Sequence, residues 1–316
     1  MDVGRMLAEW CAEPKNMCNF AGGAINKINQ KKKMATDNKP IQIDLAAIVK
    51  ARLGSKSRFV PGFLVRRLEK TICQAELNKL LRDNYPRRGA EFCRGVFNDL
   101  DVSIKVAGED KLPPVEHRRV IIASNHPLGG LDGMALIDYF QRRYGGQVYF
   151  LVNDLLMAVE PLGDVFLPIN KHGSQSRGSI EKIDKVLAGD DPVLIFPAGL
   201  CSRRGKDKSI RDLEWKKMFV VKAIQYQRDI IPVYFEGRNS DFFYNFAQWR
   251  KRSGLKFNVE MVYLPREVFR SRGKQFTIHC LPPIGWRELG PVSQARETAA
   301  AIKTRVYATA PQKQQR

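Results

Sequence analysis

The stretch Val120-Ile-Ile-Ala-Ser-Asn-His-Pro-Leu-Gly-Gly-Leu-Asp-Gly133 decides the fold of this chain of 316 residues. It begins with a continuous apolar run, which predicts a strand buried on both faces of a sheet. Pro127, Gly129 and Gly130 then permit a tight turn, and Asp132 stands where the next helix should begin. A buried strand, a turn and a helix in direct succession are typical of an α/β protein.

The same alternation continues on both sides of this stretch, from Asp101 onwards. The expected strands are 119–124, 147–152, 165–169, 193–196, 230–235 and 275–280. The expected helices are 131–143, 175–189, 212–228, 240–253 and 292–307. We therefore predict an α/β domain over residues 101–316, with a mostly parallel sheet flanked by helices. In such sheets the functional residues gather in loops at the carboxyl ends of the strands.

Residues 34–100 are expected to form a helical region that docks on a membrane. Apolar residues recur there at roughly helical spacing, with Lys and Arg between them, and a basic amphipathic segment can lie in a bilayer interface. The inserting end would consist of Phe59, Pro61, Phe63 and Leu64. A helix packed on the core is the alternative, and for any single helix it is the commoner case.

Residues 1–33 form a basic extension that ends in Asn29-Gln30-Lys31-Lys32-Lys33. The polar stretch that starts at Met34 reads like an ordinary protein start, so Met34 rather than Met1 is a candidate for the true first residue. A disordered basic arm that adds membrane affinity is the other interpretation. No apolar run approaches the roughly 20 residues that span a bilayer, and no signal-peptide core is present, so we expect peripheral membrane contact.

The charge of the chain favours an anionic partner. Lys and Arg number 53 against 33 Asp and Glu, a net charge of +20. Nucleic acid, an acidic membrane leaflet and an acidic carrier protein would all suit it. Nothing matches a helix-turn-helix, zinc-finger or RNP pattern, so we expect no nucleic-acid partner. The six cysteines form no CxxC pair and none has zinc-ligand spacing to a histidine, so we expect no metal site.

His126 and Asp132 are the candidate catalytic pair. They could not share a helix face at this spacing, so the chain must turn back for them to meet. A neutral imidazole can take a proton from a hydroxyl, while a carboxylate holds its tautomer and stabilises the imidazolium. Asp132 could also be a plain helix N-cap, but the strand end and the glycine-rich turn favour catalysis. The turn contains no obvious nucleophile, so a substrate hydroxyl would attack.

Three further blocks follow: Gly163-Asp-Val-Phe-Leu-Pro-Ile-Asn-Lys171, Phe196-Pro-Ala-Gly-Leu-Cys-Ser-Arg203 and Ile231-Pro232-Val233. With the His–Asp turn, they resemble in order the four motifs of the glycerolipid acyltransferase superfamily, the lysophosphatidate-acyltransferase-like enzymes. The resemblance spans about residues 119–235, and four ordered blocks are far more specific than any one of them.

Two departures resemble a divergent branch of that superfamily. Five residues separate His126 from Asp132 where the usual pattern has four, and Ala198 replaces the usual Glu of the third block, with Leu200-Cys201 in place of Thr-Arg. The branch includes hemolysin-like proteins and acyltransferases of lyso-ornithine and lyso-glycine lipids. The resemblance therefore implies an acceptor that is either a lyso-amino-acid lipid or lysophosphatidate.

The resemblance also implies the roles of the site residues. His126 would be the general base and Asp132 its orienter. Apart from the resemblance, we expect the oxyanion to be stabilised by N–H groups near Gly129 and Gly130 or by the N-terminus of the following helix. The head group of the acceptor would be bound by Lys171, Arg177, Gly199, Ser202, Arg203 and Arg204. Lys206, Lys208 and Arg211 would extend this positive patch, although a solvated loop is the alternative for each. Cys201 is read as a small loop residue, since no histidine stands beside it in the sequence.

The predicted activity is O-acyl transfer onto the hydroxyl of a lysolipid, without an acyl-enzyme, a metal or a bound cofactor. The acyl donor would be a thioester of acyl carrier protein or coenzyme A. Such an enzyme would act in membrane lipid biosynthesis at the cytoplasmic face of the inner membrane, bound peripherally to an anionic surface, or in the cytoplasm. The alternative is a non-catalytic, hemolysin-like protein that binds or perturbs lipid membranes.

Overall fold

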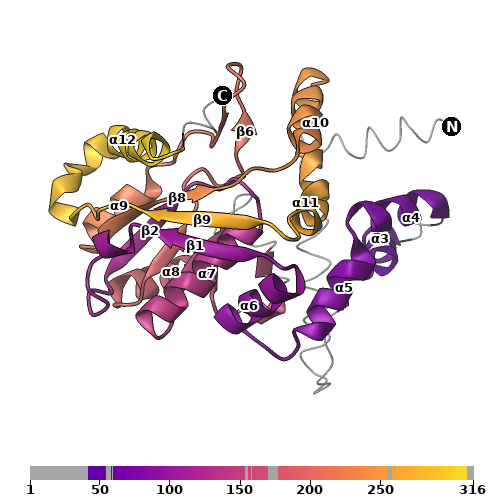
Figure 1. Cartoon of the computed structure of the whole chain (residues 1–316), viewed down its shortest axis with the longest axis horizontal. Coiled ribbons are helices and arrows are strands. Elements are labelled where there is room, and N and C mark those ends of the chain that lie inside the picture. Colours follow the sequence, from indigo (N-terminus) through magenta and orange to yellow (C-terminus); the bar gives the residue numbers. More distant parts are fainter. Residues whose placement is uncertain are drawn as a thin grey trace.

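The computed structural model describes residues 42–54, 58, 60–153, 156–157, 159–169, 177–254 and 258–311. The predicted extension 1–33, the candidate start Met34, and two predicted site residues, Phe59 and Lys171, lie outside these ranges. Seven strands of the described chain form one sheet (Figure 1). In spatial order they are β1 (Ser103–Ala107), β9 (Gln275–Cys280), β8 (Asp229–Glu236), β2 (Val120–Ser124), β5 (Val193–Ile195), β3 (Tyr149–Asn153) and β4 (Phe166–Ile169).

The prediction of a mostly parallel sheet is confirmed. Strands β8, β2, β5, β3 and β4 run parallel to one another, β9 is antiparallel to β8, and β1 is parallel to β9. All five residues of β2 are buried, as its continuous apolar sequence predicts for a central strand. The sequence analysis missed β1, an edge strand in which Ser103, Lys105 and Ala107 are exposed, because it lacks a continuous apolar run.

Helices cover both faces of the sheet (Figure 1). On one face lie α6 (Gly89–Asp99) and α7 (Leu131–Tyr144), and on the other lie α8 (Arg177–Ala188), α9 (Met218–Gln225) and α12 (Ala295–Ala308). Side chains of β2 alternate between the two layers: Val120 and Ile122 pack with α6 and α7, whereas Ile121 and Ala123 pack with α8, α9 and α12. The result is two apolar cores separated by one sheet.

The predicted helix 212–228 begins only at Met218. Residues 212–217 instead form a loop, in which Asp212 and Trp215 are buried and the Trp215 Nε1–H donates to Asp212 at 2.9 Å. A side-chain acceptor that bonds nearby groups competes with helix formation, which explains the late start. Two short strands, β6 (Arg203–Arg204) and β7 (Ile210–Arg211), pair as a hairpin that the sequence analysis did not predict.

After β8 the chain forms three consecutive helical segments. These are α10 (Asp241–Arg252), the short 3₁₀ helix η5 (Val259–Tyr263) and α11 (Leu264–Arg270). Other 3₁₀ turns are η2 (Glu109–Lys111), η4 (Glu160–Leu162), η6 (Trp286–Leu289) and η7 (Val292–Gln294). Because α10 follows β8 directly, it projects from the same edge of the sheet as the loop after β2 (Figure 1).

The described part of residues 34–100 is helical, as predicted. It consists of α3 (Leu45–Leu53), α4 (Gly62–Thr71), α5 (Gln74–Asp83) and α6. Neither α4 nor α5 has a buried residue, and Phe63 is 61% exposed, whereas α6 packs into the core although it precedes residue 101. Membrane docking by this region stays a prediction. In the described part of the chain, no helix is both long enough and apolar enough to cross a bilayer.

Arg228 links the sheet to α8 at the end of the sheet where β2 and β8 begin, opposite to the end that carries His126. It is fully buried, and its guanidinium donates to five backbone carbonyls. The acceptors are Val186, Leu187 and Gly189 at the end of α8, Val120 at the start of β2, and Asp191. One side chain thus satisfies carbonyls of α8, of β2 and of the turn before β5.

We expect Arg228→Leu to lower the free energy of unfolding by about 3 kcal/mol or more, because several buried carbonyls lose their donors at once. Arg119→Leu is the matched control, since the Arg119 guanidinium also donates to the carbonyls of Ala188 and Gly189 but its side chain is 40% exposed. That variant should lose less than about 1 kcal/mol. Urea unfolding followed by circular dichroism measures both, and equal losses would contradict the expectation.

Candidate active site

The loop after β2 is anchored to the neighbouring strand β8. Asn125 is buried, its Nδ2 donates to the Phe235 carbonyl at 3.0 Å, and its Oδ1 accepts from the Phe235 N–H at 2.6 Å. The side-chain amide therefore continues the ladder of the sheet by one more pair of hydrogen bonds. This fixes where the chain leaves the strand, and so fixes the position of His126 next to it.

His126 and Asp132 meet, as the turn in the sequence requires. Nδ1 of His126 lies 2.9 Å from Oδ2 of Asp132, with the histidine side chain 16% exposed and the aspartate fully buried. The imidazole stacks on Phe196, with ring centroids 3.9 Å apart and planes at 18°. Among the described residues none hydrogen-bonds to Nε2 of His126. The ring is thus held through Nδ1 and by stacking, and proton transfer at Nε2 stays a prediction.

Asp132 is held by the turn that precedes it. Its Oδ2 accepts from the N–H groups of Leu128 and Gly129, and its Oδ1 from those of Gly130 and Gly133. Burial by itself raises the pKa of Asp132, but the charge and hydrogen bond of His126 and these N–H groups outweigh burial, so the pKa is lowered. The carboxylate is therefore ionised at neutral pH and can stabilise an imidazolium.

Gly129 and Gly130 form the turn between His126 and α7. Gly129 has φ +79°, and a Cβ there would lie 2.8 Å from Leu264, so this position requires glycine. Their N–H groups donate to Asp132 at 3.4 and 3.0 Å. In this structure the two groups position the carboxylate, and the oxyanion role expected for them stays a prediction.

Asp212 holds the backbone of His126 from a distant loop. Oδ1 of Asp212 accepts from the His126 N–H at 3.2 Å and from the Ser202 hydroxyl at 2.6 Å, and the Ser202 N–H donates to the His126 carbonyl at 2.7 Å. The Asp212 N–H donates to the Tyr307 hydroxyl at 2.7 Å. Burial raises the pKa of Asp212 despite its hydrogen bonds to Ser202 and Trp215. The sequence analysis missed this residue, because it lies 86 positions from His126 and inside a predicted helix.

The third sequence block wraps around the catalytic pair. Gly199 has φ +67° and its N–H donates to the carbonyl of Phe196 at 2.9 Å, which closes the turn behind the ring that stacks on His126. Cys201 is fully buried, and burial raises its thiol pKa to about 11, so it acts as a packing residue. Ser202 is likewise buried and joins the His126 backbone to Asp212.

The two arginines that follow differ in what they contact. Arg203 donates to Glu260 at 2.9 Å, and Glu260, which is fully buried, also accepts from Arg250 at 3.1 Å. Arg204 instead bonds Asp241 and Asn245 of α10, the latter at 2.7 Å. Arg204 therefore faces the cavity described next, whereas the guanidinium of Arg203 is committed to Glu260, and acceptor binding by Arg203 stays a prediction.

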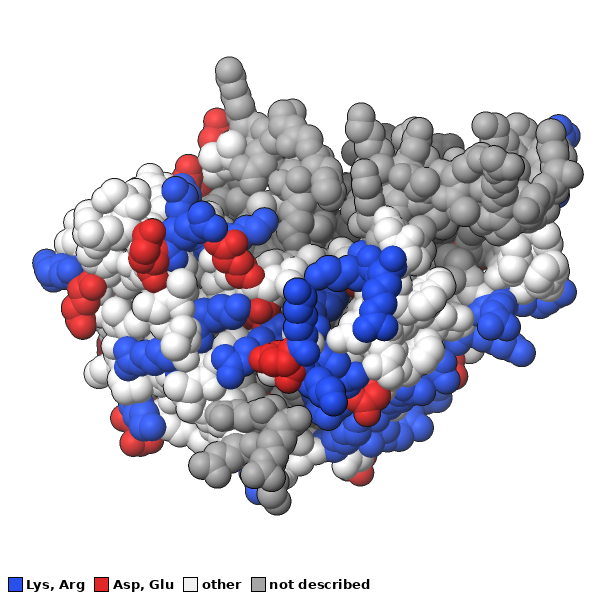
Figure 2. All heavy atoms as spheres, turned by 90° about the horizontal axis from the view of Figure 1, so that it is seen from above, with Lys and Arg blue, Asp and Glu red and all other residues white. Residues whose placement is uncertain are grey.

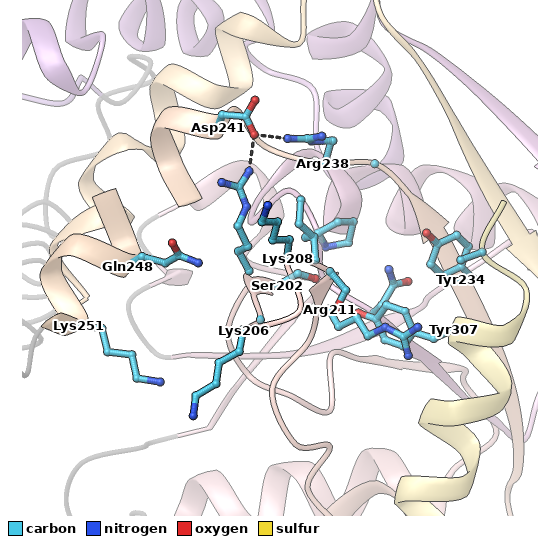
Figure 3. A pocket seen from close by; sticks show the side chains of 18 of the residues that line it. Ser202, Lys206, Lys208, Arg211, Tyr234, Arg238, Asp241, Gln248, Lys251 and Tyr307 are labelled. Atoms are coloured by element: carbon cyan, nitrogen blue, oxygen red, sulfur yellow. Dashed lines mark hydrogen bonds and ion pairs between the residues drawn. The ribbon is translucent and has the colours of Figure 1, made fainter. Parts of the chain in front are cut away.

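An open cavity of about 1120 Å³ adjoins the histidine. It is lined by Asn125 and Pro127, the two chain neighbours of His126, and by Ser202 and Tyr307. Its basic lining consists of Arg204, Lys206, Lys208, Arg211, Arg238, Lys251 and Arg252. Among the described residues one carboxylate, Asp241, lines it, and Arg204 and Arg238 both pair with that group (Figure 3). The cavity is therefore strongly cationic.

Most of the basic side chains come from two elements on either side of the cavity. Lys206, Lys208 and Arg211 belong to the β6–β7 hairpin and Lys251 to the end of α10 (Figure 3), while Arg238 lies in the loop between β8 and α10. Lys and Arg also gather broadly on this side of the molecule (Figure 2). The predicted positive patch thus lines a cavity next to His126. Arg177 begins α8, but its side chain lies outside what the structure describes.

The other described histidines each pair with a carboxylate through Nε2. Nε2 of His117 lies 2.9 Å from Asp229, and Nε2 of His279 lies 3.1 Å from Glu236. Within the described ranges, no group of three or more His, Cys, Asp or Glu side chains is arranged to hold a metal ion. The chemistry that the described geometry supports is proton transfer at Nε2 of His126 beside a binding site for an anion.

Known acyltransferases are similar to this chain over most of its length. A family model described as an acyltransferase matches residues 47–312. A lyso-glycine lipid O-acyltransferase of Phocaeicola vulgatus is 42% identical over 272 residues, 86% of this chain and 96% of the relative. A lyso-glycine lipid O-acyltransferase of Bacteroides thetaiotaomicron is 40% identical, covering 86% of this chain and 99% of its own length. Among solved structures, the lysophosphatidate acyltransferase PlsC from Thermotoga maritima matches with a TM-score of 0.43 and 13% identity. The match covers 96% of this chain and 94% of PlsC, but the similarity is too remote to bear on function.

Proposed function

Because this chain belongs to the acyltransferase family and is an acyltransferase, we propose that it transfers a fatty acyl group from a thioester to the hydroxyl of a lyso-amino-acid lipid. One observation carries the proposal: His126, paired with Asp132, stands between Asn125 and Pro127, which line a cavity whose charged lining residues are seven Lys and Arg and, among the described residues, one Asp. A base for the hydroxyl and a site for an anionic head group are what such a reaction needs. Family membership disfavours the non-catalytic alternative.

The reaction can be written with the groups at hand. The acceptor hydroxyl donates to Nε2 of His126, which takes the proton as the oxygen attacks the thioester carbon. Asp132, hydrogen-bonded at Nδ1, keeps the ring in the tautomer that can accept at Nε2 and then stabilises the imidazolium. The tetrahedral intermediate collapses, the C–S bond breaks, and the imidazolium returns the proton to the thiolate. An ester and a free thiol result, and no acyl-enzyme forms.

The acceptor would be oriented by its head group in the cavity. A carboxylate or phosphate attracts the Lys and Arg side chains there, and a guanidinium such as that of Arg204 can bind either group in bidentate fashion. We favour a lyso-glycine lipid over lysophosphatidate, because the two relatives named above carry that acceptor in their names and cover most of the chain. Either acyl carrier protein or coenzyme A could deliver the acyl group, since both carry anionic groups beside the thioester.

The test uses purified full-length protein, acyl thioesters labelled in the acyl chain, and His126→Ala as control. Acyl carrier protein and coenzyme A thioesters are each offered with lyso-glycine lipid and with lysophosphatidate. We expect label in the lyso-glycine lipid product and none with the variant. Preferential transfer to lysophosphatidate would overturn the choice of acceptor. Absence of transfer in all four combinations, with folded protein, would overturn the proposed reaction.

Charge reversal in the cavity should weaken acceptor binding selectively. We expect Lys206→Glu combined with Lys208→Glu to raise KM for the acceptor about tenfold or more and to leave kcat within about threefold, because the two residues line the cavity but do not touch the catalytic pair. Lys182→Glu with Lys185→Glu on α8 makes the same change in net charge on exposed residues outside the cavity. Equal effects from the two double variants would mean that overall charge, not this cavity, sets KM.

A further inference from the structure

Helix α10 carries an exposed aromatic stripe that the proposed reaction does not use. Phe243, Tyr244 and Ala247 form its buried face. Phe242, Phe246 and Trp249 recur every three to four residues on another face, so that they stand in one row along the helix. Phe242 is 41% exposed and Trp249 is 56% exposed, while Phe246 between them is half-buried.

The stripe is one continuous surface. Phe242 and Phe246 stack with ring centroids 5.9 Å apart, and Phe246 and Trp249 stack at 5.7 Å. Tyr263, at the end of η5, meets Phe242 and Phe246 edge-on at 5.0 and 5.3 Å. We call these four residues the aromatic ladder. Single apolar residues on a surface need no explanation, but a contiguous aromatic patch indicates a surface that contacts something apolar.

Basic side chains lie on and beside the ladder. The Arg266 guanidinium lies 6.0 Å from the centre of the Phe242 ring, while Lys251 and Arg252, which follow Trp249 at the end of α10, line the adjacent cavity. Aromatic rings with adjacent Lys and Arg are the composition that partitions into the interface of an anionic bilayer, where the rings enter the head-group region and the cations contact phosphates. The charge of +20 on the whole chain acts in the same direction.

The position of α10 connects the ladder to the cavity. Gln248, Lys251 and Arg252 of the same helix line the cavity, and Arg204 of the hairpin bonds Asp241 and Asn245 at its first two turns. In Figure 1 the helix and the hairpin project from one side of the sheet, and in Figure 3 the basic side chains of both point into one space. A bilayer in contact with the ladder would therefore lie beside the cavity mouth.

We propose that the aromatic ladder inserts into the interface of an anionic lipid bilayer and places the cavity at the membrane surface. The inference rests on the proposed lipid acceptor, which would pass from the leaflet to His126 without crossing bulk water. This contact is distinct from the one predicted for Phe63 and Leu64 on α4, since it lies on α10, another face of which lines the cavity.

The test compares two triple variants of the full chain. Phe242→Ser, Phe246→Ser and Trp249→Ser together remove the ladder, while Ile180→Ser, Leu213→Ser and Val292→Ser remove side chains that are 41%, 47% and 47% exposed on other elements. Flotation with vesicles of phosphatidylcholine and phosphatidylglycerol measures binding. We expect the ladder variant to bind at least tenfold more weakly than wild type, and the control variant to bind within twofold of it. Equal binding by wild type and both variants would overturn the proposal.

A second measurement locates the contact on α10. The measurement is made in a Trp10→Phe background, because Trp10 lies in the basic extension and would report on that segment instead. Vesicles with brominated acyl chains should quench the tryptophan emission of this parent and of its Trp286→Phe variant, and should quench its Trp249→Phe variant far less, because Trp215 is buried in the core. Quenching that is unchanged in Trp249→Phe would place the membrane contact elsewhere. A wild-type dimer in solution that becomes monomeric in the ladder variant would assign this face to a second copy of the chain and overturn the proposal.

Activity assays separate this inference from the proposed function. With an acceptor presented in vesicles, the ladder variant should lose at least tenfold in rate, and with a short-chain acceptor in solution it should stay within twofold of wild type. Loss of both activities would mean that the ladder supports the fold of the site rather than membrane contact. If wild type transfers to neither acceptor, the proposed reaction fails, but the flotation and quenching results still decide the ladder.

Discussion

Replacing His126 by alanine is expected to lower kcat for acyl transfer by about 10²–10⁴-fold and to leave the protein folded. The loss follows from removing the group that accepts the hydroxyl proton. The fold should persist because Asp132, although buried, keeps its four backbone N–H donors when the imidazole is gone. The free energy of unfolding should therefore change by about 1 kcal/mol or less.

His117→Ala is the matched control for that variant. His117 also pairs with an aspartate, Asp229, at 2.9 Å, but it lies outside the cavity described here and its side chain is 43% exposed. Initial rates at saturating acceptor and donor, with thermal melts of both variants, make the comparison. A loss of kcat below tenfold in His126→Ala would remove His126 from the mechanism, and an equal loss in His117→Ala would point to a general effect of losing a histidine.

Asp132→Asn is expected to reduce both activity and stability. The amide lacks the charge that stabilises an imidazolium and lets the ring adopt the wrong tautomer, so kcat should fall by about 10²–10⁴-fold. Each carboxylate oxygen of Asp132 is surrounded by hydrogen-bond donors. These include the N–H groups of Leu128, Gly130 and Gly133. In Asp132→Asn the side-chain NH₂, itself a donor, must replace one of these oxygens and leaves its N–H neighbours without an acceptor. The free energy of unfolding should therefore fall by about 3 kcal/mol.

The pH dependence of that stability difference has a definite sign. The pKa of Asp132 is lowered in the folded protein from its ordinary value of 3.8. Its carboxylate therefore stabilises the fold fully above the unfolded pKa, and this contribution is lost as the pH falls through the folded pKa. The difference between wild type and Asp132→Asn in urea unfolding should therefore shrink as the pH falls below about 4. A difference that stays the same or grows below that pH would contradict a lowered pKa of Asp132.

The aromatic ladder and the catalytic pair illustrate two levels of predictability. His126 and Asp132 belong to one short segment, and the residues between them can form only a few turns, so the sequence sufficed to predict that the two side chains meet. The ladder joins α10 to Tyr263 of η5, and its exposure depends on which face of α10 the rest of the fold covers. A helical pattern predicts the helix but not which neighbour buries it.

The sequence by itself predicted the six longer strands other than β1, the helices between them, the mostly parallel sheet and the His–Asp turn, because each depends on local patterns of apolar residues, glycine and proline. Only the tertiary structure decided which distant groups complete the site. Asp212 reaches the backbone of His126, Glu260 engages Arg203 while Arg204 faces the cavity, and α10 closes that cavity opposite the hairpin. The physical reason is that these contacts join segments far apart in the chain, whose meeting is set by the packing of whole layers on the sheet rather than by any local pattern.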